Sequence, residues 1–141
     1  MFALMTIDSI RRKDRSEEWS VILKRIGEEV YLPIYVGNYQ AHLIRWELIS
    51  PRPYYYDLNL EDIDSMGIDT RFAKLDWVVI DSFLYNAFHA RLQFEYRGSV
   101  CEIDYPVAKA IALAIRTNAL MIVEEQVLKQ AGIGVENAVN N

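Results

Sequence analysis

One pattern occurs twice in this chain and constrains its fold more than any other feature. Residues 34–45 read IYVGNYQAHLIR, and residues 103–116 read IDYPVAKAIALAIR. Each segment has the pattern of a strand, a tight Gly or Pro corner, and an apolar helix that contains alanine. A unit of this kind that is repeated inside a short chain predicts a pseudo-symmetric fold with two comparable helix starts.

The alignment of Ala41 with Ala110 places Gln40 opposite Lys109, in the first turn of each predicted helix. A lysine there meets the positive end of the helix dipole, which costs about 0.3 to 1 kcal/mol, so we expect something to compensate it. A partner carboxylate or hydration of the ammonium would do so. Alternatively, Lys109 and the nearby backbone amides bind an anion such as a phosphate.

Chain length and composition indicate a single globular domain. The 141 residues suffice for a single core, and the hydrophobic share of 52% excludes a disordered chain. The longest apolar run, Ala110–Ile115, is too short to span a bilayer, so we expect no membrane partner. The opening MFALM lacks the features of a secretory signal, and we therefore expect a cytoplasmic protein. We predict a single domain over residues 1–133 and a flexible tail over 134–141.

Charge and metal-ligand patterns exclude several classes of function. A net charge of -5 argues against a broad basic surface that coats nucleic acid, although a local binding site stays open. Cys101 is the only cysteine, which excludes an internal disulfide and a cysteine-based zinc cluster. Neither His42 nor His89 has a second histidine or a carboxylate at the spacing of H-E-x-x-H, so we assign neither to a metal.

The order of predicted elements favours an α+β domain with a mixed, mainly antiparallel sheet and with helices on one face. We predict a loop at Asp81–Tyr85, between two long strands. The predicted strands are 3–10, 19–25, 30–36, 72–80, 86–96, 99–104 and 121–123, and the predicted helices are 38–49, 58–66, 106–118 and 124–131.

The helix predicted at 106–118 is unusually apolar, since Lys109 and Arg116 are its only ionisable residues. A helix that is apolar on nearly every side must be covered on nearly every side. Packing between subunits is one way to supply that cover, and we expect a homo-oligomer.

Several motifs in this order resemble the bacterial bifunctional nuclease (BFN) domain family. The family has an LPI motif that ends in glycine and is followed by Glu-Ala, an RP-x-x-HD-L element, an RPSDAIALA signature, and a closing EE-x-L-x-x-AG helix. The similar residues here are Leu32–Gly37 with Gln40 and Ala41, Arg52–Leu58, Pro106–Ala114, and Glu124–Gly132. The resemblance covers nearly the whole chain.

The resemblance implies an α+β fold, assembly into homo-oligomers, and degradation of both DNA and RNA. The chain departs from the family at polar positions. Gln40 stands where the family has Glu, Tyr56 where it has His, and Lys109 where it has the Asp of Ser-Asp. Arg52 and Asp57 remain from the polar set of these motifs.

Phosphodiester hydrolysis needs an activated water, stabilisation of an anionic transition state, and protonation of the leaving oxygen. Asp57 also fits a helix N-cap, and Asp104 also fits a corner that accepts backbone hydrogen bonds, so both structural roles stay open. The candidate catalytic residues are Asp57, Asp104 and Tyr56, and the candidate substrate-binding residues are Arg52, Lys109 and Gln40. The residues do not specify whether a metal is used. If one is, Mg²⁺ and Mn²⁺ are the candidates.

Two hypotheses of function follow. The first is a nuclease of the BFN type whose activity is weakened or lost through the replaced polar residues, with nucleic acid as its partner. The second is a non-catalytic, oligomeric binding or scaffold domain of the same fold. The tyrosines at 54–56 beside Arg52 fit either, because they can stack on bases or lie in an interface.

Overall fold

The computed structural model describes residues 1–49 and 73–134. The helix predicted at 58–66, the connector before it and residues 135–141 of the predicted tail lie outside the described residues. The described elements are β1 (Phe2–Arg12), β2 (Trp19–Arg25), β3 (Val30–Val36), α1 (Asn38–Ile49), β4 (Ala73–Leu84), β5 (Ala87–Tyr96), β6 (Ser99–Tyr105), α3 (Val107–Thr117), β7 (Leu120–Glu124), α4 (Glu125–Ala131) and β8 (Ile133–Gly134).

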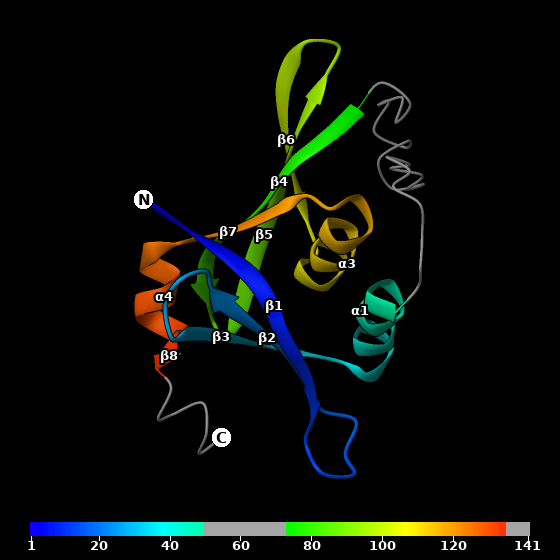
Figure 1. Cartoon of the computed structure of the whole chain (residues 1–141), viewed down its shortest axis with the longest axis vertical. Coiled ribbons are helices and arrows are strands. Elements are labelled where there is room, and N and C mark those ends of the chain that lie inside the picture. Colours follow the sequence, from blue (N-terminus) through cyan, green and yellow to red (C-terminus); the bar gives the residue numbers. More distant parts are fainter. Residues whose placement is uncertain (50–72, 135–141) are drawn as a thin grey trace.

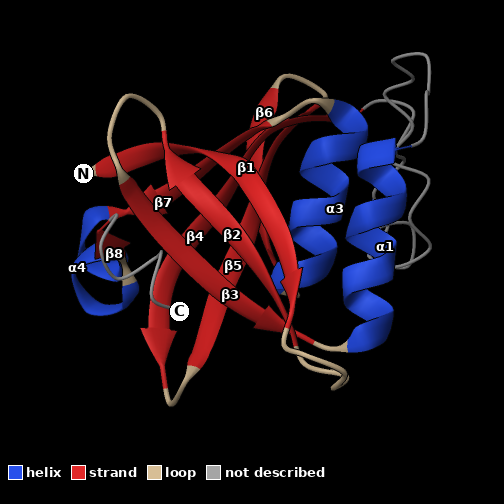
Figure 2. Cartoon of the chain, turned by 60° about the horizontal axis from the view of Figure 1, so that its bottom comes forward, coloured by secondary structure: helices blue, strands red, loops and turns tan. Residues whose placement is uncertain are grey.

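The described strands form one sheet in the order β6-β5-β4-β7-β1-β2-β3-β8. Strands β4 and β7 pair in parallel, and every other neighbouring pair is antiparallel. Helices α1 and α3 lie side by side against the sheet, and α4 lies at its other end (Figures 1 and 2). The predicted α+β class with a mixed, mainly antiparallel sheet is therefore confirmed.

One hydrophobic core lies between the sheet and the helices. Ile44 of α1, Ile111 of α3 and Val127 of α4 are fully or almost fully buried and belong to the same cluster. All three described helices thus cover the same face of the sheet, because they share one core. No helix in the described part of the chain is long and apolar enough to cross a membrane.

The repeat seen in the sequence is larger in the structure, since β1-β2-β3-α1 and β4-β5-β6-α3 are built alike. At the end of β3, Val36 pairs with Trp19, and at the end of β6, Tyr105 pairs with Ala90. Both units then turn one corner and begin a helix. The predicted strand-helix repeat therefore extends to whole three-stranded units.

The two corners have the same backbone hydrogen bond. The amide of Ala41 donates to the carbonyl of Gly37, and the amide of Ala110 donates to the carbonyl of Pro106, both at 2.9 Å. Proline is tolerated there because the first backbone N–H groups of a helix have no partner within the helix. The two corners therefore start equivalent helices with different residues.

The helices of the two units meet through an ion pair. Arg116 of α3 donates from Nε and Nη2 to Oε1 of Glu47 in α1, at 3.1 and 2.6 Å. These two residues occupy equivalent positions when Gly37 is aligned with Pro106. The helices therefore run parallel, and their N-termini open toward the same end of the pair (Figure 2).

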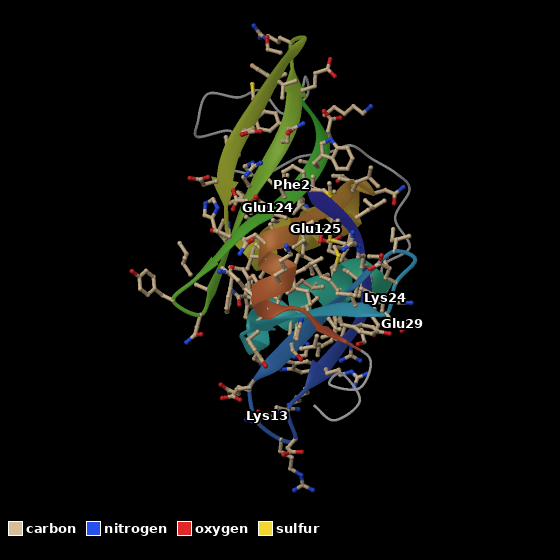
Figure 3. The ribbon with its side chains drawn as sticks, turned by 90° about the vertical axis from the view of Figure 1, so that its left-hand side faces the viewer. Phe2, Lys13, Lys24, Glu29, Glu124 and Glu125 are labelled. Atoms are coloured by element: carbon tan, nitrogen blue, oxygen red, sulfur yellow. The ribbon has the colours of Figure 1, made fainter. Side chains whose placement is uncertain are left out.

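Helix α4 is attached to the start of the chain. Both oxygens of Glu125 accept hydrogen bonds from Arg25 of β2, at 3.0 and 2.5 Å, and the amide of Glu125 donates to the carbonyl of Met1 at 3.0 Å. Figure 3 shows Glu125 beside Phe2 and Glu124, which are partners in the pairing of β1 with β7. The N-terminal strand and the last described helix therefore support each other.

The loop predicted at Asp81–Tyr85 is wrong. Strand β4 continues to Leu84, and a two-residue turn at Tyr85 and Asn86 joins it to β5. Both turn residues have positive φ, 52° and 60°, as in the tight turns that fit the twist of a hairpin. Glycine is the usual marker of such a turn, and its absence here led the sequence pattern to suggest a longer loop.

Candidate functional site

Gln40 lies in the first turn of α1 and caps that helix. Its Oε1 accepts a hydrogen bond from the amide of Gly37 at 2.9 Å, as the third residue of a capping box does. The N-cap is therefore Gly37 and not Asn38, although asparagine is a common N-cap residue. Asn38 is the first helical residue, and its Oδ1 accepts a hydrogen bond from Nε1 of Trp19 at 2.9 Å. Both side chains thus fix the start of α1, while the substrate-binding role predicted for Gln40 stays a prediction.

Lys109 occupies the equivalent turn of α3. Its side chain is exposed, whereas its neighbours Ala108 and Ala110 are buried against the core. Because α1 and α3 run parallel, Gln40 and Lys109 lie at the same end of the helix pair. This agrees with the two comparable helix starts that the repeat predicted, and the anion-binding role of Lys109 stays a prediction.

Three further predicted site residues, Arg52, Tyr56 and Asp57, lie outside the described residues. Of the predicted catalytic set, the structure therefore describes Asp104. It lies near the end of β6, and its side chain is 83% exposed. Its Oδ1 is 3.2 Å from Nε2 of His89, a residue that the sequence patterns did not assign to the site.

His89 lies between two carboxylates from neighbouring strands. Its Nδ1 is 2.6 Å from Oδ1 of Asp81 in β4, and its Nε2 faces Asp104 of β6. The other oxygen of Asp81 accepts a hydrogen bond from Nη1 of Arg91. We call Asp81, His89, Arg91 and Asp104 the histidine cluster.

Strand pairing explains how these side chains meet. Arg91 pairs directly with Asp104 across β5 and β6, so His89, two positions earlier on β5, projects from the same face. On β4, Ile80 pairs with Ala90 and Ser82 with His89, which leaves Asp81 as the extra residue of a β-bulge. A bulge redirects the side chain at the extra position, and here it brings Asp81 to His89.

The cluster lies on the face of the sheet that is opposite the core. Ala90 and Leu92 alternate with His89 and Arg91 along β5 and are buried in the core. The side chain of His89 is 46% exposed, while that of Asp81 is 18% exposed. The imidazole is therefore accessible from solvent and rests on a carboxylate that is mostly covered.

The carboxylates change the acidity of the imidazole. The hydrogen bond to Asp81 raises the pKa of His89 above its ordinary value, partial burial lowers that pKa, and the negative charges of Asp81 and Asp104 raise it further. The net effect is a raised pKa. His89 therefore keeps its proton at a higher pH than an isolated histidine does.

Arg91 links the cluster to a further acid. Its Nε is buried and has no hydrogen-bond partner among the described residues, and the carboxylate of Glu102 is 3.6 Å away. Arg91 therefore holds Asp81 in place through Nη1. The positive charge of Arg91 is balanced by Asp81 of β4 and Glu102 of β6. This support restricts the orientation in which Asp81 meets His89.

Part of the cluster has a signal in the sequence. Arg97 and Gly98, the two residues between the strands predicted at 86–96 and 99–104, form a turn that sets the register of β5 and β6, and that register places Arg91 opposite Asp104. Asp81 has no such signal, because a bulge inserts one residue at a position that hydrophobic alternation does not reveal. Among residues 1–49 and 73–134, no group of three or more His, Cys, Asp or Glu could hold a metal ion.

The chain is similar to proteins of one family. A family model described as the bifunctional nuclease domain matches residues 21–136. Two relatives from Mycobacterium tuberculosis, the uncharacterized protein MT1877 of strain CDC 1551 / Oshkosh and the uncharacterized protein Rv1829 of strain ATCC 25618 / H37Rv, are each 28% identical to it over 127 residues. The alignments cover 88% of this chain and 73% of each relative, and neither name assigns an activity.

Proposed function

The chain belongs to the bifunctional nuclease domain family, as its motifs predicted, and on this premise we propose that it hydrolyses phosphodiester bonds in nucleic acid. The observation that carries the proposal is the family match, which covers residues 21–136. The two relatives are named as uncharacterized, so the proposal takes no activity from them.

We assign the chemistry to the candidate residues predicted from the sequence. Asp57 and Asp104 are the acids and bases of the reaction, and Tyr56 donates a hydrogen bond to the substrate. Arg52 and Lys109 bind the phosphate, since both side chains are cations at neutral pH. Support for this assignment comes from Asp104, which contacts a histidine of raised pKa.

Activity should be lower than in relatives that keep the family's polar residues. Gln40 lacks the charge of the Glu in the family motif, and its amide oxygen caps α1. Lys109 adds phosphate affinity in place of an acid, which favours binding over cleavage. Tyrosine at position 56 is a poor replacement for histidine as a base, because its ordinary pKa is near 10.

The decisive test is incubation of the purified chain with labelled single-stranded and double-stranded DNA and RNA, with and without Mg²⁺ or Mn²⁺. The proposal predicts cleavage of at least one substrate, and a loss of cleavage in the variant Asp57→Ala. Complete absence of cleavage under every condition, or equal cleavage by Asp57→Ala, would contradict it.

A second candidate function is a non-catalytic, homo-oligomeric binding domain. It is favoured by apolar side chains on the face of the sheet that is opposite the core: Phe2 and Leu4 of β1 and Leu120 of β7 are 47%, 38% and 46% exposed. β1 and β7 are paired, so these side chains belong to one surface. Sedimentation at micromolar concentration tests this candidate: a multimer that Leu4→Lys dissociates supports it, and a monomer contradicts it.

A further inference from the structure

The starting observation is the arrangement around His89, which the family motifs do not include. Asp81 contacts two side chains at once, with Oδ1 directed to Nδ1 of His89 and Oδ2 to Nη1 of Arg91. A carboxylate held in this way fixes both the orientation of the imidazole and the proton on Nδ1. The opposite nitrogen, Nε2, is then set in a defined direction.

The carboxylate at Nε2 is much more exposed to solvent than the carboxylate at Nδ1. Asp104 meets Nε2 at 3.2 Å, and its side chain is 83% exposed, against 18% for Asp81. An exposed carboxylate can turn toward water at little cost, whereas Asp81 is held by Arg91. An oxygen of a substrate can therefore replace Asp104 at Nε2 while the Nδ1 contact persists.

The charged groups that face His89 come from three strands. β4 contributes Asp81, β5 contributes Arg91, and β6 contributes Asp104, with Glu102 reaching Arg91. Two carboxylates touch the imidazole directly, and the guanidinium of Arg91 is bound to Asp81. This balance favours an imidazolium that carries a proton on Nε2.

We infer that His89 is the general acid of the proposed nuclease, that it protonates the leaving oxygen from Nε2, and that Asp81 is its positioning residue. The inference rests on the proposed function and adds a proton donor that the family motifs do not supply. It also explains how cleavage proceeds with tyrosine, in place of the family's histidine, at position 56.

The proposed hydrolysis is a displacement at phosphorus. The oxygen of a water molecule forms a bond to phosphorus, and the bond from phosphorus to the leaving sugar oxygen breaks. The Nε2 proton of His89 moves to that leaving oxygen, and the proton lost by the attacking water passes to the carboxylate that acts as base in the proposed function, and from there to bulk solvent. His89 then takes a proton from solvent, and Asp104 returns to Nε2.

A raised pKa suits this role, because the donor must be protonated before the reaction at neutral pH. Activity should therefore fall as the pH rises through the pKa of His89. Removal of the negative charge of Asp81 should move that fall to lower pH, since this charge and its hydrogen bond are the main causes of the raised pKa.

The experiment measures the rates at which the full chain cleaves two substrates. One is an oligonucleotide with ordinary bridging oxygens, and the other has sulfur in place of the leaving bridging oxygen at one position. A thiolate leaves without protonation, so loss of a general acid slows only cleavage of the oxygen-bridged substrate. The variant is His89→Gln, and its control is His42→Gln, which changes the other histidine of the chain.

The expected result is a loss of about 100-fold or more for His89→Gln on the oxygen-bridged substrate, the usual contribution of a general acid, with less than about tenfold loss on the sulfur-bridged one. His42→Gln should cleave both substrates as the unaltered chain does. Asp81→Asn should shift the alkaline fall of the pH profile to lower pH, which a purely structural effect would not do.

The outcomes separate this inference from the proposed function. Cleavage of the oxygen-bridged substrate by His89→Gln at the unaltered rate overturns the inference and leaves the nuclease proposal standing. Equal losses on both substrates also overturn it, because they indicate damage to the fold or to binding. No cleavage of either substrate by the unaltered chain overturns the nuclease proposal and the inference together.

Discussion

The two three-stranded units of the sheet, β1-β2-β3 and β4-β5-β6, share a backbone plan and differ in the chemistry of their outer faces. Arg91 and Asp104 of the second unit correspond to Ser20 and Tyr35 of the first, by strand register. The position of His89 corresponds to Glu18, just before β2 begins. Inward positions repeat because both units pack into one core, whereas outward positions are free to diverge, so the two units differ most in the residues of their outer faces.

The bulges repeat this comparison at the level of single residues. β1 has a bulge with Asp8 at the extra position, and β4 has the equivalent bulge with Asp76 there. A second bulge, at Asp81, is present in β4 alone of these two strands. That additional bulge brings a carboxylate to His89, and it distinguishes the second unit, which carries the proposed proton donor, from the first.

The contact that joins the two units should give the largest effect on stability. Arg116→Leu leaves the carboxylate of Glu47, whose side chain is 1% exposed, without its arginine. We expect a loss of about 3 kcal/mol in the free energy of unfolding, measured by urea denaturation. The double variant Glu47→Leu/Arg116→Leu should recover much of that loss, and a double variant as unstable as the single one would contradict this account.

The histidine cluster should stabilise the second unit more than the corresponding surface stabilises the first. Asp81→Ala removes the hydrogen bonds to His89 and Arg91, which should cost about 2 kcal/mol in the free energy of unfolding. Glu18→Gln in the first unit removes an exposed contact with Lys13 at 3.5 Å and should cost less than about 0.5 kcal/mol. Equal costs, measured under the same denaturation conditions, would erase the difference between the units.

The pH dependence of stability should show a smaller effect, which belongs to the second unit because that unit contains His89. The pKa of His89 is raised in the folded chain, so its protonated form contributes stability that is complete below the unfolded pKa, about 6.5, and is lost as the pH rises through the folded pKa. The difference in free energy of unfolding between the unaltered chain and His89→Gln should therefore shrink from pH 5.5 to pH 9. A difference that grows over this range would contradict the raised pKa.

The hairpin tips should give the smallest effect. The tip of the second unit places Tyr85, a fully exposed aromatic residue, and Asn86 at positive φ. Tyr85→Asn/Asn86→Gly introduces the residues that such turns prefer and should raise the free energy of unfolding by about 0.5 to 1 kcal/mol. Thermal unfolding measures this gain, and a loss would mean that Tyr85 makes contacts that stabilise the chain.

Hydrophobic pattern predicted most of the described fold because burial sets the period of each element. The strands at 19–25 and 30–36 and the helix at 38–49 have the predicted bounds, and the repeat at 34–45 and 103–116 led to the paired helices. The extension of β4 through Asp81 was missed, because a bulge interrupts the period and a turn without glycine gives no local signal.

The candidate site was harder to predict from the sequence than the fold, because its residues are brought together by strand register. Asp104 was identified beside its corner, but its contact with His89 requires the pairing of β5 with β6. Gln40 was identified from the repeat, while its hydrogen bond to Gly37 depends on the geometry of the helix start. Motif positions therefore indicated the family, and the register of the strands indicated a candidate proton donor.

The most direct test of the central claim, that nucleic acid is bound and cleaved at the second unit, is a titration of the full chain with a short thymidine oligonucleotide, followed by NMR of the backbone amides. The account predicts that the largest shifts occur at Asp81, His89 and Asp104. Shifts that are equal or larger at Ser20 and Tyr35, the corresponding positions of the first unit, would contradict it, as would the absence of any shift.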